Sequence, residues 1–463
     1  GAVRGIGGAG EADLDHGAVS GKYTGALWRA IRFRLSEGGS KWVSSPVAGS
    51  PLLTCRRMAR MAGTAESSGN RWTALAVLTF ARTAMGFQFQ SVGAVSPLLM
   101  ERLHIANTEL GWLIGLFSLP GVFLALPGGL LGGRFGDRRV VLAGLGLMTV
   151  GSALMGAAEG FAAVVVGRLL SAVGAILLNV LLTKMVADRF VGREIIWAMT
   201  VLINAWPVGI GLASLTLPVV ANAWGVSAVF HVSAGAAAVG AVGIALLYSP
   251  APRAVLHAGS LGLAGLSRRE TGLVSVASVP WMLYNVGYAV MLGFVPSLLV
   301  RGGLSVEQAG VLLGLSTLLM IGSVLLGGAS AQWLARPEIV VILGLVAFTG
   351  GLVVLPYAPP WPTLMAVGLL GGLPAGTLIA APTAVLRPQN RGAGMGLFYT
   401  GYYAGMTLLP PVAGWLQDVF GGSAALYFAA AAVLAALPFY VAFRAMSKTR
   451  EGPIAGADRA RQA

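Results

Sequence analysis

The sequence predicts an all-α integral membrane protein with twelve transmembrane helices in two pseudo-symmetric six-helix bundles. Of its 463 residues, 56% are hydrophobic and only 10% are charged, whereas a soluble domain carries roughly 25% charged residues. Apolar stretches of about 20 residues, the length that crosses a bilayer core of about 30 Å, recur from Trp72 to the end of the chain. The composition therefore excludes an ordinary soluble enzyme.

The apolar stretches define the expected helices in chain order. Each is followed by a short break with charged or turn residues, such as RFGDRR at 134–139 or APP at 358–360. The expected spans are 72–96, 110–131, 140–158, 162–183, 195–219, 226–248, 272–299, 309–331, 339–357, 363–385, 394–416 and 424–443.

The segments outside the spans divide the chain into five parts. The first is rich in glycine and serine and lacks the apolar core of a signal peptide, and we interpret it as a disordered tail. We hypothesise that the natural start lies at Met58 or Met61. The expected parts are a cytoplasmic tail at 1–71, a bundle at 72–249, a cytoplasmic linker at 250–271, a bundle at 272–445 and a cytoplasmic tail at 446–463.

The basic residues predict the orientation. One set of alternating loops carries twelve Lys or Arg residues, and the opposite set carries only two, Arg102 and Arg301. Because basic loops stay in the cytoplasm, both termini are expected there, and we expect a bacterial inner membrane. The net charge of +14 is thus mostly explained by topology, and no nucleic-acid partner is expected.

Other classes of activity find little support in the sequence. The single cysteine, Cys55, excludes an intrachain disulfide and a Cys-based metal site. We find no nucleophile and base pattern in the spans, no GxxxxGK[ST] loop for ATP and no soluble output domain of a sensor. We therefore expect neither an enzyme nor a cofactor or metal.

The two halves of the sequence repeat at an offset of about 200 residues. Pro97 falls on Pro296, and Gly111 and Gly115 fall on Gly310 and Gly314. Since each half has an even number of spans, the halves are parallel repeats about an axis along the membrane normal. This layout is typical of a transporter that holds one solute near the midplane, and we expect a monomer in the lipid bilayer.

The sequence resembles the major facilitator superfamily over residues 72–445. The stretch 129–139 is similar to the family's GxLaDRxGRr loop, which latches the two bundles on the cytoplasmic face. Its usual Asp position is occupied by Gly133, and an Asp follows four residues later. A second similarity is Arg168-x-x-Ser171-x-x-Gly174. The resemblance implies that the cytoplasmic gate motif consists of Gly129, Arg134, Gly136, Asp137 and Arg138.

Within the superfamily, two stretches look most like the cyanate and nitroimidazole permease group. They are MGFQFQS at 85–91 and NVLLTKMVAD at 179–188. This resemblance implies that the solute is a small anion or a small polar organic molecule.

The charges inside the expected spans are all positive. Every Asp and Glu falls in a loop or tail, whereas Arg82 and Arg168 lie deep within spans, where an ionisable residue costs about 2.5 kcal/mol or more. Arg82 predicts a clamp for a carboxylate or oxyanion. The alternative is a structural arginine bonded to backbone carbonyls, and for Arg168 a structural or gating role is also open.

The second half offers aromatic residues where the first half offers cations. At an offset of 199 residues, the Arg82 face of the first span corresponds to a face with Trp281, Tyr284 and Tyr288, and span eleven carries a similar face that includes Tyr403. Packing is the alternative role for these rings. The candidate solute contacts are Arg82, Gln90, Arg168, Asn179, Asn204, Trp281, Tyr284, Asn285, Tyr288, Tyr399 and Tyr402.

The sequence thus predicts a secondary transporter of a small solute, an organic or inorganic anion, that works by alternating access between two bundles. With no carboxylate in the spans, coupling would come from exchange or from a proton that enters with the anion. The alternative is an exporter of amphipathic drugs or sugars, which the aromatic stripes favour.

Overall fold

The structure is a computed structural model that describes residues 68–125, 127–190, 194–249, 265–334 and 336–448. These residues belong to the compact unit Glu66–Ala463; the other unit, Gly1–Ala65, lies outside the described residues. The expectations for the N-terminal tail, for most of the linker at 250–271 and for most of the C-terminal tail fall outside them as well.

The N-terminal half consists of helices that correspond to the first six expected spans. The second expected span, 110–131, is broken into short helices, because Pro120 and Pro127 each lack a backbone N–H. The elements are α3 Ser68–Gln90, η1 Gly93–Val95, α4 Ser96–Leu103, α5 Asn107–Gly115, α6 Leu119–Leu124, α7 Gly128–Phe135, α8 Asp137–Ala157, α9 Phe161–Ala187, α10 Glu194–Trp224 and α11 Val226–Leu247.

The C-terminal half repeats this order. Its tenth expected span, 363–385, is also broken, at Gly371 to Pro374 and at Pro382. The elements are α12 Arg268–Arg301, α13 Val306–Trp333, α14 Pro337–Val354, α15 Pro360–Gly371, α16 Ala375–Ala380, η3 Ala381–Ala384, η4 Pro388–Asn390, α17 Arg391–Phe420 and α18 Ala424–Lys448.

Nine segments of the described chain are long and apolar enough to cross a membrane. The three other expected spans are α3, the broken segment α5 to α7, and α17. Two of these segments carry polar side chains within the span: α3 carries Arg82, and α17 carries Tyr399, Tyr402 and Tyr403. Both helices contribute residues to the cavity described below.

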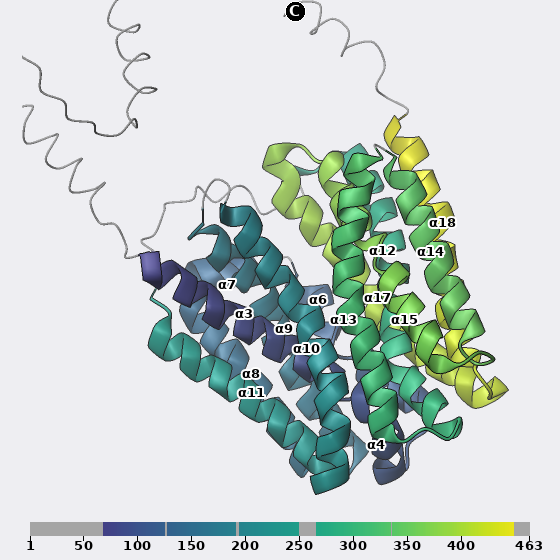
Figure 1. Ribbon diagram of the computed structural model, residues 1–463. Helices are drawn as coiled ribbons and strands as arrows, with labels where there is room; N and C mark the ends of the chain where they lie inside the picture. The colour runs from purple at the N-terminus through teal and green to yellow at the C-terminus, as the bar shows by residue number, and fades with distance from the viewer. Residues whose placement is uncertain (1–67, 126, 191–193, 250–264, 335, 449–463) are drawn as a thin grey trace, which may run out of the picture. The chain divides into compact units, whose positions relative to one another are not determined.

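The two halves pack in the same pattern, as the repeat in the sequence predicts. In the N-terminal half, coloured purple to teal in Figure 1, α3 packs on α10 and α11, and α8 packs on α11. In the C-terminal half, coloured green to yellow, α12 packs correspondingly on α17 and α18, and α14 packs on α18.

Two symmetric seams join the halves: α5 packs on α17, and α10 packs on α13. A Cβ atom at Gly111 would clash with the backbone of Pro410, and one at Gly310 with the backbone of Ser214. The repeat-related glycines therefore have the same role, which is to let the backbones of the two halves approach closely.

The helices run between two ends, which we name after one residue at each. The Asp418 end carries Asn107, Trp224 and Asp418, and the Lys184 end carries Lys184 and Arg391. The glycine contacts between the halves, from Asn107 against Gly414 to Gly115 against Thr407, lie toward the Asp418 end. The halves are thus closed against each other at that end.

Candidate functional site

A cavity of about 280 Å³ lies between the two halves, on the Lys184 side of the seams. Helices α3, α9 and α10 of the first half and α12, α13, α16 and α17 of the second half contribute to its lining. None of the described residues that line it is an Asp or a Glu. In the described part of the chain, no three His, Cys, Asp or Glu side chains are grouped so that they could hold a metal ion.

Arg82 is the cation in this lining. It lies in the middle of α3 and is partly exposed, but its Nε and Nη1 atoms are buried and have no hydrogen-bond partner among the described residues. Its guanidinium lies close to Tyr399 and Tyr403 of α17. A guanidinium presents its N–H groups in a planar fork that fits a carboxylate. Arg82 therefore brings a positive charge with unpaired N–H groups to the wall of the cavity.

The aromatic wall of the cavity belongs to α12 and α17. The Trp281 ring stacks on Tyr284, with ring centres 6.0 Å apart, and lies 6.2 Å from Tyr402. Tyr402 in turn contacts Tyr399 and Tyr403. The result is a continuous apolar surface for a solute body that bears rings or hydrocarbon.

Polar atoms are set into this aromatic wall. The Tyr284 hydroxyl donates to the carbonyl of Gly371 at 3.1 Å and is therefore occupied. In contrast, Trp281 Nε1 and the Tyr288 hydroxyl are buried without a hydrogen-bond partner that meets the distance and angle criteria among the described residues, and the Tyr288 hydroxyl lies close to Thr317. Trp281 and Tyr288 thus keep donors for a ligand.

Arg168 differs from Arg82, because it is fully buried and does not line the cavity. Its Nε, Nη1 and Nη2 atoms donate to the carbonyls of Leu113, Gln88 and Phe89 at 2.9, 3.0 and 2.9 Å. The guanidinium also lies 4.5 Å from the centre of the Phe117 ring. These bonds to backbone carbonyls are those expected of a structural arginine. Arg168 holds the broken helix of the second span against α3.

Asn179 and Tyr403 connect the halves at the depth of the cavity. Asn179 Nδ2 on α9 donates to the Tyr403 hydroxyl on α17 at 3.0 Å. A Cβ atom at Gly121 of α6 would overlap the Tyr403 ring, so this ring of the second half fits directly against the first half. Asn179 and Tyr403 both line the cavity.

The three remaining amides lie in different surroundings. Asn204 and Asn285 line the cavity, and each donates to a carbonyl of its own helix, that of Thr200 and that of Trp281. Gln90 is buried outside the lining and donates to the carbonyl of Leu292 across the two halves at 3.2 Å. Of the eleven candidate contacts, Gln90 and Arg168 are the two that the cavity does not include.

The expected gate motif lies at the Lys184 end, where α7 meets α8. Gly129 and Arg134 are in α7, and Gly136 connects the helices with φ = +89°, a backbone conformation that favours glycine. Arg138 donates to the carbonyl of Ala245 at 2.5 Å.

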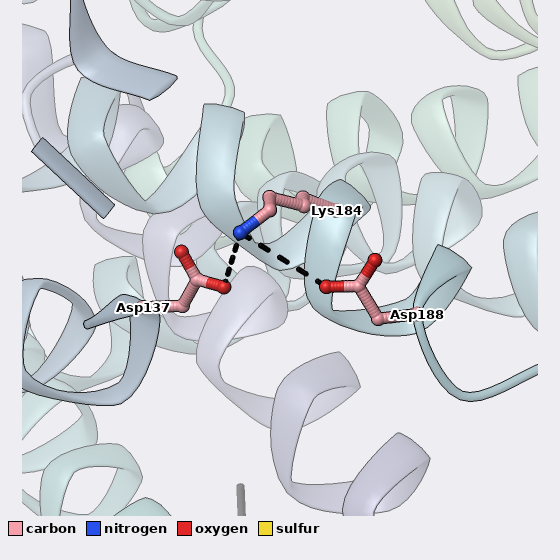
Figure 2. A network of polar contacts seen from close by, with 3 residues as sticks. All are labelled: Asp137, Lys184 and Asp188. Atoms are coloured by element: carbon pink, nitrogen blue, oxygen red, sulfur yellow. Dashed lines mark hydrogen bonds and ion pairs between the residues drawn. The ribbon is translucent and has the colours of Figure 1, made fainter. Parts of the chain in front are cut away.

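Asp137 begins α8, and Lys184 of α9 bonds it at 2.5 Å and lies 4.0 Å from Asp188, as Figure 2 shows. The resemblance left open what replaces the Asp at Gly133. In this structure Asp137 pairs within the first half, and the pair does not bridge the halves.

Besides Tyr403, three aromatic residues that line the cavity are absent from the candidate list, namely Phe89, Phe117 and Trp206. They pack together with ring centres 5.3 to 6.5 Å apart. Phe89 lies seven residues after Arg82 and thus on the same helix face, a spacing that could have identified it. Phe117 follows a helix break, so no periodic pattern marks it.

Comparison with known proteins agrees with this fold. A profile described as Major Facilitator Superfamily matches residues 78–359 and 281–462, which together include nearly all of the described chain. The crystal structure of a D-xylose-proton symporter superposes with a TM-score of 0.68 at 15% identity and covers 80% of this chain and 97% of that one.

Two curated relatives match parts of the chain. An uncharacterized 38 kDa protein of Thermoproteus tenax is 30% identical over 213 residues, 45% of this chain, and this chain spans only 55% of its length. The 3-(3-hydroxy-phenyl)propionate transporter of Escherichia coli K12 is 26% identical over 354 residues, 72% of this chain and 84% of that protein. With the profile match to more than half of its length, the chain belongs to the Major Facilitator Superfamily, a family of multi-pass membrane transporters rather than enzymes.

Proposed function

We propose that this protein is a secondary transporter of a small organic carboxylate with an apolar or aromatic body. The observation that carries the proposal is Arg82, a cation with unbonded N–H groups at a cavity whose described lining contains no carboxylate and includes an aromatic wall. A carboxylate would accept the free donors and compensate the charge, and its body would rest on Trp281 and Tyr402.

The size of the cavity favours an organic solute over the smallest anions. A cavity of about 280 Å³ has room for several water molecules and therefore for an organic solute. Cyanate would leave most of this volume to water. Among the solutes that the likeness to the cyanate and nitroimidazole permease group implies, we therefore favour the larger organic ones. The relative from Escherichia coli is named for an aromatic carboxylate, which supports the same choice.

The solute would move by alternating access, with the bundles at 72–249 and 272–445 as the moving units. The asymmetry of basic loops supports a cytoplasmic Lys184 end and cytoplasmic termini in a bacterial inner membrane. The described structure would then be open to the cytoplasm and closed outside. We propose a monomer, since each chain contributes both walls of its cavity, and coupling by exchange or by a proton that enters with the anion.

Uptake into proteoliposomes tests the proposal. The protein should accumulate radiolabelled 3-phenylpropionate, and Arg82→Gln should lower uptake at least tenfold, the effect of losing about 1.4 kcal/mol of charge-assisted bonding. Arg336→Gln is the matched control, because Arg336 is exposed in a loop at the Lys184 end and should transport normally. Equal uptake by the Arg82 variant and the control would refute the role of Arg82.

The aromatic wall also favours the second candidate, an exporter of neutral amphipathic drugs or sugars. Tyr402 and Trp281 would then bind the solute, and Arg82 would contribute nothing. In this case Tyr402→Ala should abolish transport of a neutral probe while Arg82→Gln leaves it intact. The pattern of these two variants distinguishes the two functions.

A further inference from the structure

The N-terminus of α5 is capped by a residue of the other half. The Asp418 carboxylate at the end of α17 accepts hydrogen bonds from the backbone N–H groups of Asn107 and Thr108 at 2.9 and 2.8 Å. It also accepts bonds from the Asn107 amide at 2.8 Å and the Thr108 hydroxyl at 2.6 Å. Free N–H groups and a partial positive charge are found at the start of any helix, so an anion is stabilising there.

Comparison of α5 with α13, its counterpart in the repeat, shows why α5 is capped by a residue of the other half. At the 199-residue offset, Ala106 corresponds to Ser305, the residue that precedes α13. The Ser305 hydroxyl accepts from the N–H of Gln308 and caps its own helix, whereas Ala106 has no side-chain oxygen. The rest of the motif is retained, since Glu109 bonds the Ala106 N–H as Gln308 bonds that of Ser305. Only the capping oxygen of α5 is missing, and Asp418 supplies it.

The cap exists only while the halves are closed at this end. From Asp418 toward the Lys184 end, α17 packs along the second span in direct backbone contact. Cβ atoms at Gly414, Gly111 and Gly115 would clash with the facing helix. Separation of this seam would remove the carboxylate from α5 and leave the N–H groups of Asn107 and Thr108 to water. Burial alone would raise the pKa of Asp418, but these bonds outweigh burial and lower it, so the carboxylate is ionised at neutral pH.

We propose that Asp418 is a latch of the closed Asp418 end, a helix cap supplied in trans that sets the equilibrium between the two access states. The inference rests on the alternating-access part of the proposed function and is independent of the solute. The second seam, between α10 and α13, has no such dependence, because Ser305 caps α13 within its own half in either state.

The expected effect is that of a lost N-cap. Replacing a capping side chain by alanine costs about 1 kcal/mol, which corresponds to roughly a fivefold change in an equilibrium constant. Because Asp418 is exposed and the four bonds share two oxygens, we expect the open-to-closed ratio to rise about fivefold in Asp418→Ala and less in Asp418→Asn, which keeps one acceptor oxygen.

Distances between spin labels measure this ratio directly in the full chain. Cys55→Ser provides a background without cysteine, since the chain has one. Labels at Glu159 and Tyr357 lie at exposed positions between α8 and α9 and between α14 and α15, at the Asp418 end of either half. Double electron-electron resonance in nanodiscs then separates a short closed distance from a longer open one.

Two further variants make the test specific. Glu109→Gln is the matched control, because it removes one carboxylate from the same helix start without affecting the contact between halves. It should leave the ratio unchanged. Ala106→Ser supplies the cap within the first half, so opening no longer leaves α5 uncapped, and the ratio should rise although Asp418 is intact.

The outcomes separate the latch from the proposed function. A ratio in Asp418→Ala that equals the ratio in Glu109→Gln overturns the latch, while alternating access stands if both distances are seen. A single distance in every variant overturns both. A ratio that responds to Asp418 in a protein that does not transport 3-phenylpropionate supports the latch and overturns only the proposed solute.

Discussion

The two arginines inside the membrane should respond in opposite ways to truncation. Arg168 is fully buried and donates three hydrogen bonds to backbone carbonyls. The Nε and Nη1 atoms of Arg82 have no hydrogen-bond partner among the described residues. Replacing either by Met removes a buried charge and keeps an unbranched side chain of similar length. The difference between the two variants therefore reports mainly the value of the three hydrogen bonds of Arg168.

The magnitude follows from those bonds. Hydrogen bonds between membrane helices average about 0.6 kcal/mol, and bonds to charged groups are worth about 1.5 kcal/mol or more, so three bonds give about 2 to 5 kcal/mol. Arg168→Met should be less stable than Arg82→Met by that amount. At roughly 2 °C per kcal/mol for a chain of this size, the Tm values should differ by about 4 to 10 °C.

Thermal unfolding of purified protein, followed by tryptophan fluorescence, measures this difference. Arg82→Met should unfold at or above the Tm of the unmodified protein, because the charge that it removes has no partner to lose. Equal Tm values for the two variants, or a larger loss for Arg82→Met, would refute the distinction between a structural and a ligand-binding arginine.

Three further predictions follow from single contacts. Gly136→Ala should lower the free energy of unfolding by about 1 kcal/mol or more, because φ is +89° at this position. Gly133→Ala lies inside α7 with open space around it and should raise the Tm slightly. Equal Tm shifts for the two variants would contradict this. Tyr403→Phe removes the bond from Asn179 and should raise the open-to-closed ratio about threefold, the equivalent of about 0.6 kcal/mol; spin-label distances check it. The pKa of Asp418 in the folded protein lies below its ordinary value of 3.8. The stabilisation of the closed state by Asp418 is therefore present above pH 3.8 and is lost as the pH falls through the folded pKa. Acid should raise the open-to-closed ratio of the unmodified protein but not that of Asp418→Asn.

The course of the helices was largely predictable because hydropathy determines which segments enter a bilayer. The nine apolar segments coincide with expected spans, and Gly111 and Gly310, which the repeat aligns, both lie against the backbone of the other half. The breaks in the second and tenth spans were not predicted, although Pro120, Pro127 and Pro382 were visible. A proline breaks or bends a helix depending on whether neighbouring groups satisfy the freed carbonyls, which depends on tertiary packing.

The candidate site was predictable to the extent that helical spacing reports a shared face. Trp281, Tyr284 and Tyr288 line the cavity together, as their spacing indicated, and Arg82 lines it as well. Spacing did not separate Arg82 from Arg168, because the partners of Arg168 are backbone carbonyls of distant residues, and a carbonyl leaves no trace in the sequence. The capping of α5 by Asp418 was equally hidden, since it joins residues more than 300 positions apart.

Direct binding measurements test whether Arg82 binds the negative group of the solute. Calorimetry should show that 3-phenylpropionate binds at least tenfold more tightly than its neutral amide, because a bond to a charged group is worth about 1.5 kcal/mol or more. Arg82→Gln should reduce this preference to near unity and leave binding of the amide unchanged. Equal affinities for acid and amide in the unmodified protein, or an undiminished preference in Arg82→Gln, would contradict the account.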